Sequence, residues 1–137
     1  MARWLFKTEP SEYSFADLEK AGRAVWDGVA NPMALKHMRS AAPGDAVVVY
    51  HTGSERQAVG LAEIASAARP DAKDAKLSVI ELSAGKRLAR PVGLDEIKAS
   101  RLFADSPLVK MGRLSIVPLD AAQWKWLLDM AKRRPAK

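Results

Sequence analysis

The segment Trp26-Asp27-Gly28-Val29-Ala30-Asn31-Pro32 joins a strand end, a turn and a helix start within a few residues. Residues 23–26 form a short predicted strand. Asn31 before Pro32 is typical of a helix N-cap followed by proline at the first helical position, and Gly28 allows a sharp turn or a close approach to a ligand. We therefore expect Trp26 and Asp27 at a strand-to-helix junction, where an aromatic face and a carboxylate can hold a flat polar ring such as a nucleobase.

The chain before this segment predicts one strand and one short helix. Residues 3–7 have the pattern of a strand. Ser14 followed by Asp17 resembles a capping box, with aspartate in place of the usual glutamate or glutamine. The helix that it opens is expected to end near Gly22. After Asn31, an apolar stripe of Ala34, Leu35 and Met38 indicates a second helix.

The rest of the chain predicts a mostly antiparallel sheet with helices around it. Tight turns join the central strands, which favours antiparallel pairing, and about six strands with four short helices indicate the α+β class. Gly60 within a long strand suggests a bulge or a close backbone approach, as a sheet curving towards a small barrel requires. The predicted elements are strands at 46–51, 57–68, 77–83 and 113–119, an extension at 87–91, a polar loop at 69–76, and helices at 94–98 and after Asp120.

Length and charge predict one domain that binds a polyanion. The 137 residues suit a single domain over residues 1–131, followed by a basic tail over residues 132–137. The chain has 22 Lys plus Arg against 16 Asp plus Glu, a net charge of +6, which favours a nucleic acid as partner. Lys132, Arg133, Arg134 and Lys137 carry four of those six charges, and a basic tail is often only solvated.

The composition excludes several kinds of chemistry. There is no cysteine, which excludes disulfides and thiolate sites and agrees with a cytoplasmic location. The N-terminus lacks the apolar core of a signal peptide, and no apolar run is long enough to span a bilayer. His37 and His51 are the only histidines, and there is no glycine-rich phosphate loop. We expect no metal, no cofactor and no membrane partner.

Polar side chains gather at the predicted strand ends. Lys7-Thr8-Glu9 offers a cation, a hydroxyl and a carboxylate that can bind a base edge or a phosphate, although ordinary loop polarity also explains them. His51 follows Tyr50 at the end of a predicted strand. It is either an ordinary polar residue where the strand ends or a residue whose ring nitrogen faces a ligand at the mouth of a barrel. Arg113 can pair with a phosphate or with Asp27.

Six blocks of the sequence, taken in order, resemble one family. Their order and spacing are similar to those of the EVE domain, the fold of the thymocyte nuclear protein family within the PUA-like superfamily. The resemblance extends from Arg3 to about Leu128 and implies a PUA-like pseudo-barrel, a curved mixed sheet with short helices around it. The blocks are 4–10, 13–18, 26–29, 50–52, 58–63 and 113–119.

The resemblance implies a non-enzymatic protein that holds a modified nucleobase of DNA or RNA at the barrel mouth. We expect it to be a monomer, in the cytoplasm or on the nucleoid. Trp26 would stack on the base, and Asp27 and Asn31 would hydrogen-bond its edge. Lys7 and Arg113 would lie near phosphate. Trp26→Ala is expected to abolish binding and leave the fold intact. Carried over residue by residue, the pocket comprises Lys7, Thr8, Glu9, Trp26, Asp27, Val29, Asn31, Tyr50, His51, Thr52, Arg113, Leu114 and Ser115.

Two other functions stay open at this point. PUA-like ASCH domains include amidohydrolases that act on modified nucleosides, and Lys7 could activate Thr8 for such chemistry. Adjacent residues of an extended segment point in opposite directions, which argues against their acting on one atom. A protein-interaction module that uses the basic tail is the third interpretation. Ala30 stands where many relatives have arginine, so a cation of the family pocket is absent here.

Overall fold

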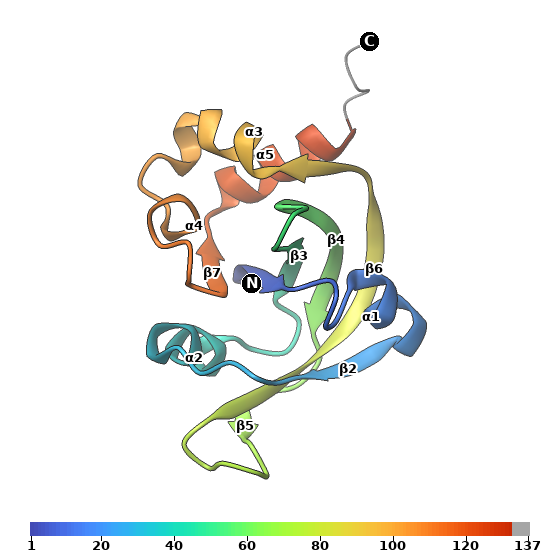
Figure 1. Ribbon diagram of the computed structural model, residues 1–137, viewed down its shortest axis with the longest axis vertical. Coiled ribbons are helices and arrows are strands. Elements are labelled where there is room, and N and C mark those ends of the chain that lie inside the picture. Colours follow the sequence, from blue (N-terminus) through green and yellow to red (C-terminus); the bar gives the residue numbers. More distant parts are fainter. Residues whose placement is uncertain (133–137) are drawn as a thin grey trace.

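One curved sheet organises residues 1–132, the part of the chain that this computed structural model describes (Figure 1). The strand order is β2-β6-β4-β3-β1-β7, and β5 pairs with β6. The strands are β1 (Arg3–Thr8), β2 (Arg23–Trp26), β3 (Ala46–His51), β4 (Gln57–Ile64), β5 (Arg69–Pro70), β6 (Ser78–Gly93) and β7 (Ile116–Leu119). The helices are α1 (Phe15–Ala21), α2 (Pro32–Ser40), α3 (Leu94–Ala99), α4 (Pro107–Lys110) and α5 (Ala121–Lys132), with a 3₁₀ turn at Arg101–Phe103.

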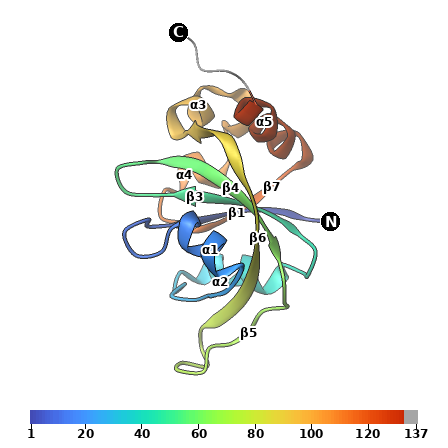
Figure 2. The same cartoon turned by 90° about the vertical axis from the view of Figure 1, so that its right-hand side faces the viewer.

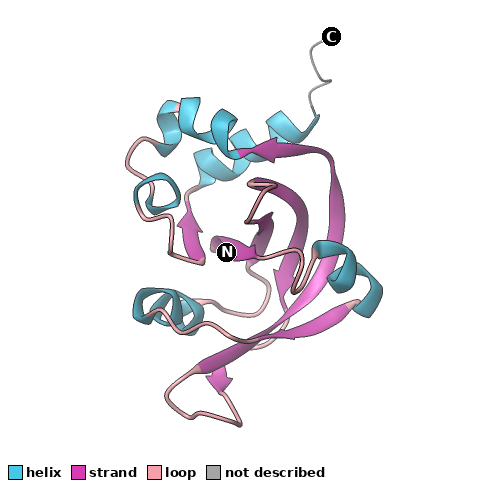
Figure 3. Cartoon of the chain, in the orientation of Figure 1, coloured by secondary structure: helices cyan, strands magenta, loops and turns pink. Residues whose placement is uncertain are grey.

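The sheet is mixed because β1 runs parallel to β3, whereas the other neighbouring strands run antiparallel. β1 lies between β3 and β7, and Leu5 and Phe6 are fully buried although they point to opposite faces. Figure 3 shows α3, α4 and α5 gathered at one end of the sheet, and α5 contacts β6 there. The predicted α+β class and curved mixed sheet are confirmed, and the sheet stays open.

β6 is the longest strand and sets the curvature of the sheet. It runs from the β5 hairpin to α3 as one strand of 16 residues (Figure 2). The strand predicted at 77–83 and the extension predicted at 87–91 belong to this one strand, because the residues between them pair with β4, where Ala62 lies opposite Ala84. The ladder shifts register on both sides of Gly60, and the Phe15 ring fills the space beside that glycine. Gly60 is therefore both a bulge and a close approach, as predicted.

Other element boundaries also differ from the predictions. The strand predicted at 57–68 ends at Ile64, and the predicted loop at 69–76 contains β5. The final strand begins at Ile116 rather than Arg113. Neither the 3₁₀ turn nor α4 was predicted, because each is only three or four residues long and holds too little periodic pattern to be seen in sequence. Within residues 1–132, no helix is long and apolar enough to cross a bilayer.

The helix starts follow their sequence signals. Ser14 accepts from the Asp17 amide at 3.1 Å, and the Asp17 carboxylate accepts from the Ser14 amide at 2.8 Å, which completes the predicted capping box. Asn31 caps α2 by accepting from Met33 and Ala34. Asp120 Oδ1 accepts from the Gln123 amide at 2.7 Å. These caps fix where α1, α2 and α5 begin, and the Asn31 cap positions the Trp26–Pro32 segment at the start of α2.

Asp45 ties the N-terminus to the turn before β3. Its carboxylate is buried and accepts from the amides of Ala2 (3.1 Å) and Ala42 (2.9 Å) and from the Trp4 indole (3.0 Å). Burial alone would raise the pKa of Asp45. The hydrogen bonds from Ala42, Trp4 and Ala2 outweigh it, so the pKa lies below its ordinary value of 3.8.

We expect Asp45→Asn to remove part of the acid sensitivity of folding. A carboxyl whose pKa is lower in the folded state contributes stability above its unfolded pKa, near pH 4, and this contribution is lost as the pH falls through the folded pKa. The free energy of unfolding of the wild type should therefore fall more between pH 6 and pH 3 than that of Asp45→Asn. Urea titrations at both pH values measure this difference, and equal falls in both proteins would contradict it.

Candidate functional site

A pocket of about 570 Å³ opens where the ends of several elements meet, a volume within the range of small-ligand sites. It lies between the end of β1, the loop before α1, the β2–α2 junction and the loop before β7. We call it the junction pocket. Its lining residues are Lys7, Thr8, Glu9, Glu12, Tyr13, Val25, Trp26, Asp27, Gly28, Val29, Ala30, Asn31, Arg113 and Ser115.

Hydrogen bonds to the backbone and a turn at Gly28 hold these segments together. The Lys7 amide donates to the Ser115 carbonyl at 2.8 Å, which fixes the loop before β7 beside β1. The Thr8 hydroxyl donates to the Tyr13 carbonyl at 2.6 Å and closes the loop between β1 and α1. Gly28 has a φ of 74°, a conformation that favours glycine, and it turns the chain from β2 towards α2. Three sequence-distant segments thus line one cavity.

Aromatic side chains form the inner wall of the junction pocket. Trp26 is only 7% exposed and pairs with Ile80 across β2 and β6. Its ring lies 5.9 Å from Phe6 and 5.9 Å from Tyr13, edge to face in both cases. Tyr13 is half-buried. Trp26 therefore belongs to the core as well as to the pocket, and the expectation that Trp26→Ala leaves the fold intact is corrected.

Several polar groups of the pocket are already engaged. The Thr8 hydroxyl donates to Tyr13, and one Glu9 oxygen accepts from the amide and hydroxyl of Ser11 at 3.2 and 3.1 Å. Asn31 Oδ1 caps α2, which leaves its Nδ2 as the group able to contact a ligand. Thr8 and Glu9 thus hold the walls in place, and Asn31 both caps α2 and offers its Nδ2 to a ligand.

Four charged side chains keep bonding capacity for a ligand. Within residues 1–132, no hydrogen bond or ion pair engages the side chains of Asp27, Glu12 or Arg113. The expected alternative of an Arg113–Asp27 ion pair does not form there. Lys7 Nζ donates to the Gly112 carbonyl at 3.0 Å, and burial lowers the pKa of Lys7. The pocket thus presents free carboxylates beside an aromatic wall, with cations at its edge.

Tyr50 and Thr52 lie in a second, smaller cavity of about 270 Å³, which we call the side pocket. Lys7 lines both pockets. The expectation that residues 50–52 share the junction pocket is corrected, because β3 runs beside β1 and its end opens on the other side of Lys7.

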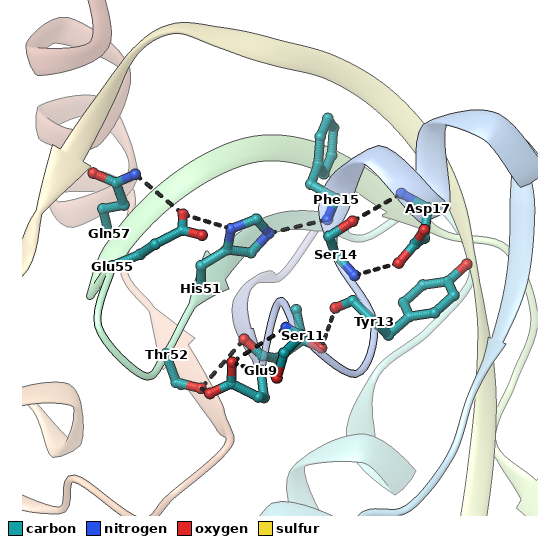
Figure 4. A network of polar contacts seen from close by, with 11 residues as sticks. Glu9, Ser11, Tyr13, Ser14, Phe15, Asp17, His51, Thr52, Glu55 and Gln57 are labelled. Atoms are coloured by element: carbon teal, nitrogen blue, oxygen red, sulfur yellow. Dashed lines mark hydrogen bonds and ion pairs between the residues drawn. The ribbon is translucent and has the colours of Figure 1, made fainter.

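His51 and Leu114 are buried behind the cavities. His51 Nε2 accepts from the Phe15 amide at 3.0 Å, and Nδ1 lies 2.9 Å from Glu55 Oε1 (Figure 4). Both ring nitrogens are occupied, so His51 links β3 to the start of α1 instead of facing a ligand. The hydrogen bond from His51 lowers the pKa of Glu55. Leu114 packs in the hydrophobic core at 1% exposed.

The sequence-based prediction missed some lining residues. Glu12 and Tyr13 enter the pocket because their amides donate to the Glu9 carbonyl and turn the loop back towards Trp26. The only sequence signal for Tyr13 was its place in a block resembling the family. Val25, Gly28 and Ala30 line the pocket simply by flanking predicted members. Within residues 1–132, no group of acidic and histidine side chains could hold a metal ion.

Comparisons with known proteins agree with this architecture. The family model "EVE domain" matches residues 2–130. Mouse thymocyte nuclear protein 1 is 25% identical over an alignment of 169 positions, gaps included, which covers 97% of this chain and 75% of the mouse protein. The structure of Rpa0253 from Rhodopseudomonas palustris is 38% identical, covers 96% of this chain and 93% of that one, and has a TM-score of 0.89.

Two further structures share the fold at lower identity. Human THYN1 in complex with 5-methylcytosine-containing DNA is 23% identical, with a TM-score of 0.91 and coverage of 98% and 100% of the two chains. ASCH from Zymomonas mobilis is 13% identical, with a TM-score of 0.57 and coverage of 93% and 94%. Because the family model matches nearly the whole described chain, this protein is a member of the EVE domain family.

Proposed function

We propose that this EVE domain binds a methylated, amine-bearing base of DNA in the junction pocket. The observation that carries the proposal is the Asp27 carboxylate, which has no partner within residues 1–132 and stands next to the aromatic wall. An unpaired carboxylate is an acceptor for an exocyclic amine, such as the N4 amine of cytosine. The exposed edge of Trp26 and the half-buried Tyr13 ring can contact the base itself.

The apolar lining provides a place for a methyl group. Val29 lines the pocket and is 7% exposed, so its side chain is part of the cavity wall rather than of the open surface. A methyl substituent placed against Val29 and Trp26 would be removed from water, which favours binding by about 0.8 kcal/mol per methylene-sized group. A methylated base is therefore expected to bind more tightly than the same base without the methyl.

The human relative is solved with DNA that contains 5-methylcytosine, which supports DNA as the partner. A base can enter the junction pocket only after it leaves the stack, and unstacking costs a few kcal/mol. Single-stranded sites should therefore bind best. RNA is the second candidate, because the contacts proposed for Asp27, Trp26 and Tyr13 are all to the base and none is to the sugar.

The ASCH-type amidohydrolase is less well supported by the contacts. Lys7 Nζ donates to the Gly112 carbonyl, whereas the Thr8 hydroxyl donates to the Tyr13 carbonyl. The two groups are thus bonded to separate partners, and no hydrogen bond joins the ammonium to the hydroxyl within residues 1–132. Incubation with acylated nucleosides tests this alternative, and turnover would favour it over simple binding.

We expect Asp27→Ala to weaken the binding of a single strand containing one 5-methylcytosine by about 1–3 kcal/mol, the cost of removing a good hydrogen bond to a base edge. Asp27 is exposed, so the fold should tolerate the change. Isothermal titration calorimetry measures the affinity. The matched control is Asp129→Ala, which removes an exposed carboxylate from α5 outside the pocket. Equal losses in both variants would mean that Asp27 does not contact the base.

A further inference from the structure

The side pocket differs from the junction pocket in its charge. The cationic side chains that line it are Lys7, Arg56 and Lys98, and no carboxylate lines it. The junction pocket has three carboxylates, from Glu9, Glu12 and Asp27, against the two cations Lys7 and Arg113. The lining of the side pocket is therefore the more favourable of the two for a phosphate, although Glu9 Oε2 approaches the side pocket at Thr52, 3.5 Å from its hydroxyl.

The three cations of the side pocket are free to bind an anion. Within residues 1–132, none of them has a carboxylate within salt-bridge distance, whereas Arg23, Arg69, Arg87, Arg90 and Lys110 are all paired. Arg56 and Lys98 are exposed, and Lys7 Nζ lies 5.8 Å from the centre of the Tyr50 ring. Asp95 lies in a neighbouring cavity that shares Arg56 and Leu94 with the side pocket.

The backbone holds Arg56 in an unusual conformation. Its φ is 48°, which makes it the one non-glycine residue with positive φ in the described part of the chain. The Arg56 carbonyl accepts from the Leu94 amide at 2.9 Å, and its Nε donates to the Gly53 carbonyl at 3.3 Å. Such strained positions cluster at functional sites. Arginine thus occupies a backbone conformation that favours glycine, in the lining of a cationic cavity.

We infer that the side pocket binds the phosphodiester next to the base held in the junction pocket. The inference rests on the proposed function, because Lys7 joins the two cavities and a nucleotide's base and phosphate must lie close together. In this arrangement the base meets the free carboxylates and the aromatic wall, while the phosphate meets Arg56, Lys98 and Lys7. The difference in charge between the two linings thus matches the difference between the neutral base and the charged phosphate of one nucleotide.

The test compares two variants that each lose two positive charges. Arg56→Gln/Lys98→Gln changes the side pocket, and Lys73→Gln/Lys125→Gln removes exposed cations that line neither pocket. Binding to a single-stranded oligonucleotide is measured over a range of salt concentrations, once with cytosine and once with 5-methylcytosine at one position. Melting temperatures confirm that the variants are folded.

We expect the plot of log affinity against log salt concentration to be shallower for the side-pocket variant than for wild type, with both strands. The slope should change by about 0.7 for each phosphate that the variant no longer neutralises. The control variant should keep the wild-type slope.

A neutral methylphosphonate beside the 5-methylcytosine should weaken binding to wild type but not to the side-pocket variant. Unchanged slope in the side-pocket variant, or equal changes in both variants, would overturn the inference. A shallower slope without preference for 5-methylcytosine would support the phosphate subsite and reject the proposed function.

Discussion

Trp26→Ala should lower the free energy of unfolding by about 3–5 kcal/mol, the usual cost of truncating a buried aromatic side chain. Trp26 is almost completely buried, contacts Phe6 and Tyr13 edge to face, and lies on the strand that pairs with β6. Removing the indole leaves a cavity between the sheet and the junction pocket. Urea denaturation measures the loss, as a lower midpoint at unchanged slope.

Trp26→Phe is the matched control for this change. A phenyl ring keeps part of the packing against Phe6 and Tyr13, so the loss of stability should be smaller than for alanine. A loss below about 0.5 kcal/mol for Trp26→Ala, the range of surface substitutions, would show that the indole is not part of the core. Because Trp26→Ala affects folding, reduced nucleic-acid binding by that variant alone does not demonstrate stacking on the base.

Gly60→Ala should destabilise the protein by about 3 kcal/mol, at the upper end of the cost of overpacking a core. A Cβ at this position would lie 2.3 Å from two atoms of the Phe15 ring and 2.5 Å from a third. Phe15 is fully buried at the start of α1, and its amide is held by His51, so the ring has little room to move. Thermal and urea denaturation both report the effect.

Two variants separate this clash from a general effect of alanine at a glycine. Gly93→Ala introduces a Cβ that meets nothing within 4 Å and should change stability little. In Gly60→Ala/Phe15→Leu the smaller side chain relieves the clash, so the loss should be less than the sum of the two single losses. Strict additivity in that cycle would contradict the proposed close approach of Phe15 to Gly60.

Local signals were enough to predict much of this fold. The Ser14–Asp17 capping box, the Asn31 cap before Pro32 and the valine-rich strand at 46–51 each depend on interactions within a few residues. The same holds for the placement of Trp26 and Asp27 at a strand-to-helix junction. Gly60 was predictable as a special position, but the ring that fills its space comes from α1 and had no local signal.

The site was predicted less completely, because its boundaries depend on contacts between distant segments. Lys7 and Trp26 were expected to share a pocket and do. Residues 50–52 were expected there too, but Tyr50 and Thr52 line the side pocket, and the pairing of β3 with β1 that puts them there exists only in the folded sheet. The polarity of His51 did not show that both of its nitrogens bond within the protein. Tyr13 reaches the pocket through a loop closed by Thr8.

The central claim is that the junction pocket recognises a methylated base through Asp27 and the aromatic wall beside it. The most direct measurement is calorimetric titration of wild type and Asp27→Ala with two single strands that differ only in one methyl group, 5-methylcytosine against cytosine. We predict that wild type binds the methylated strand more tightly and that Asp27→Ala binds both strands weakly. Equal affinity of wild type for the two strands would contradict the claim.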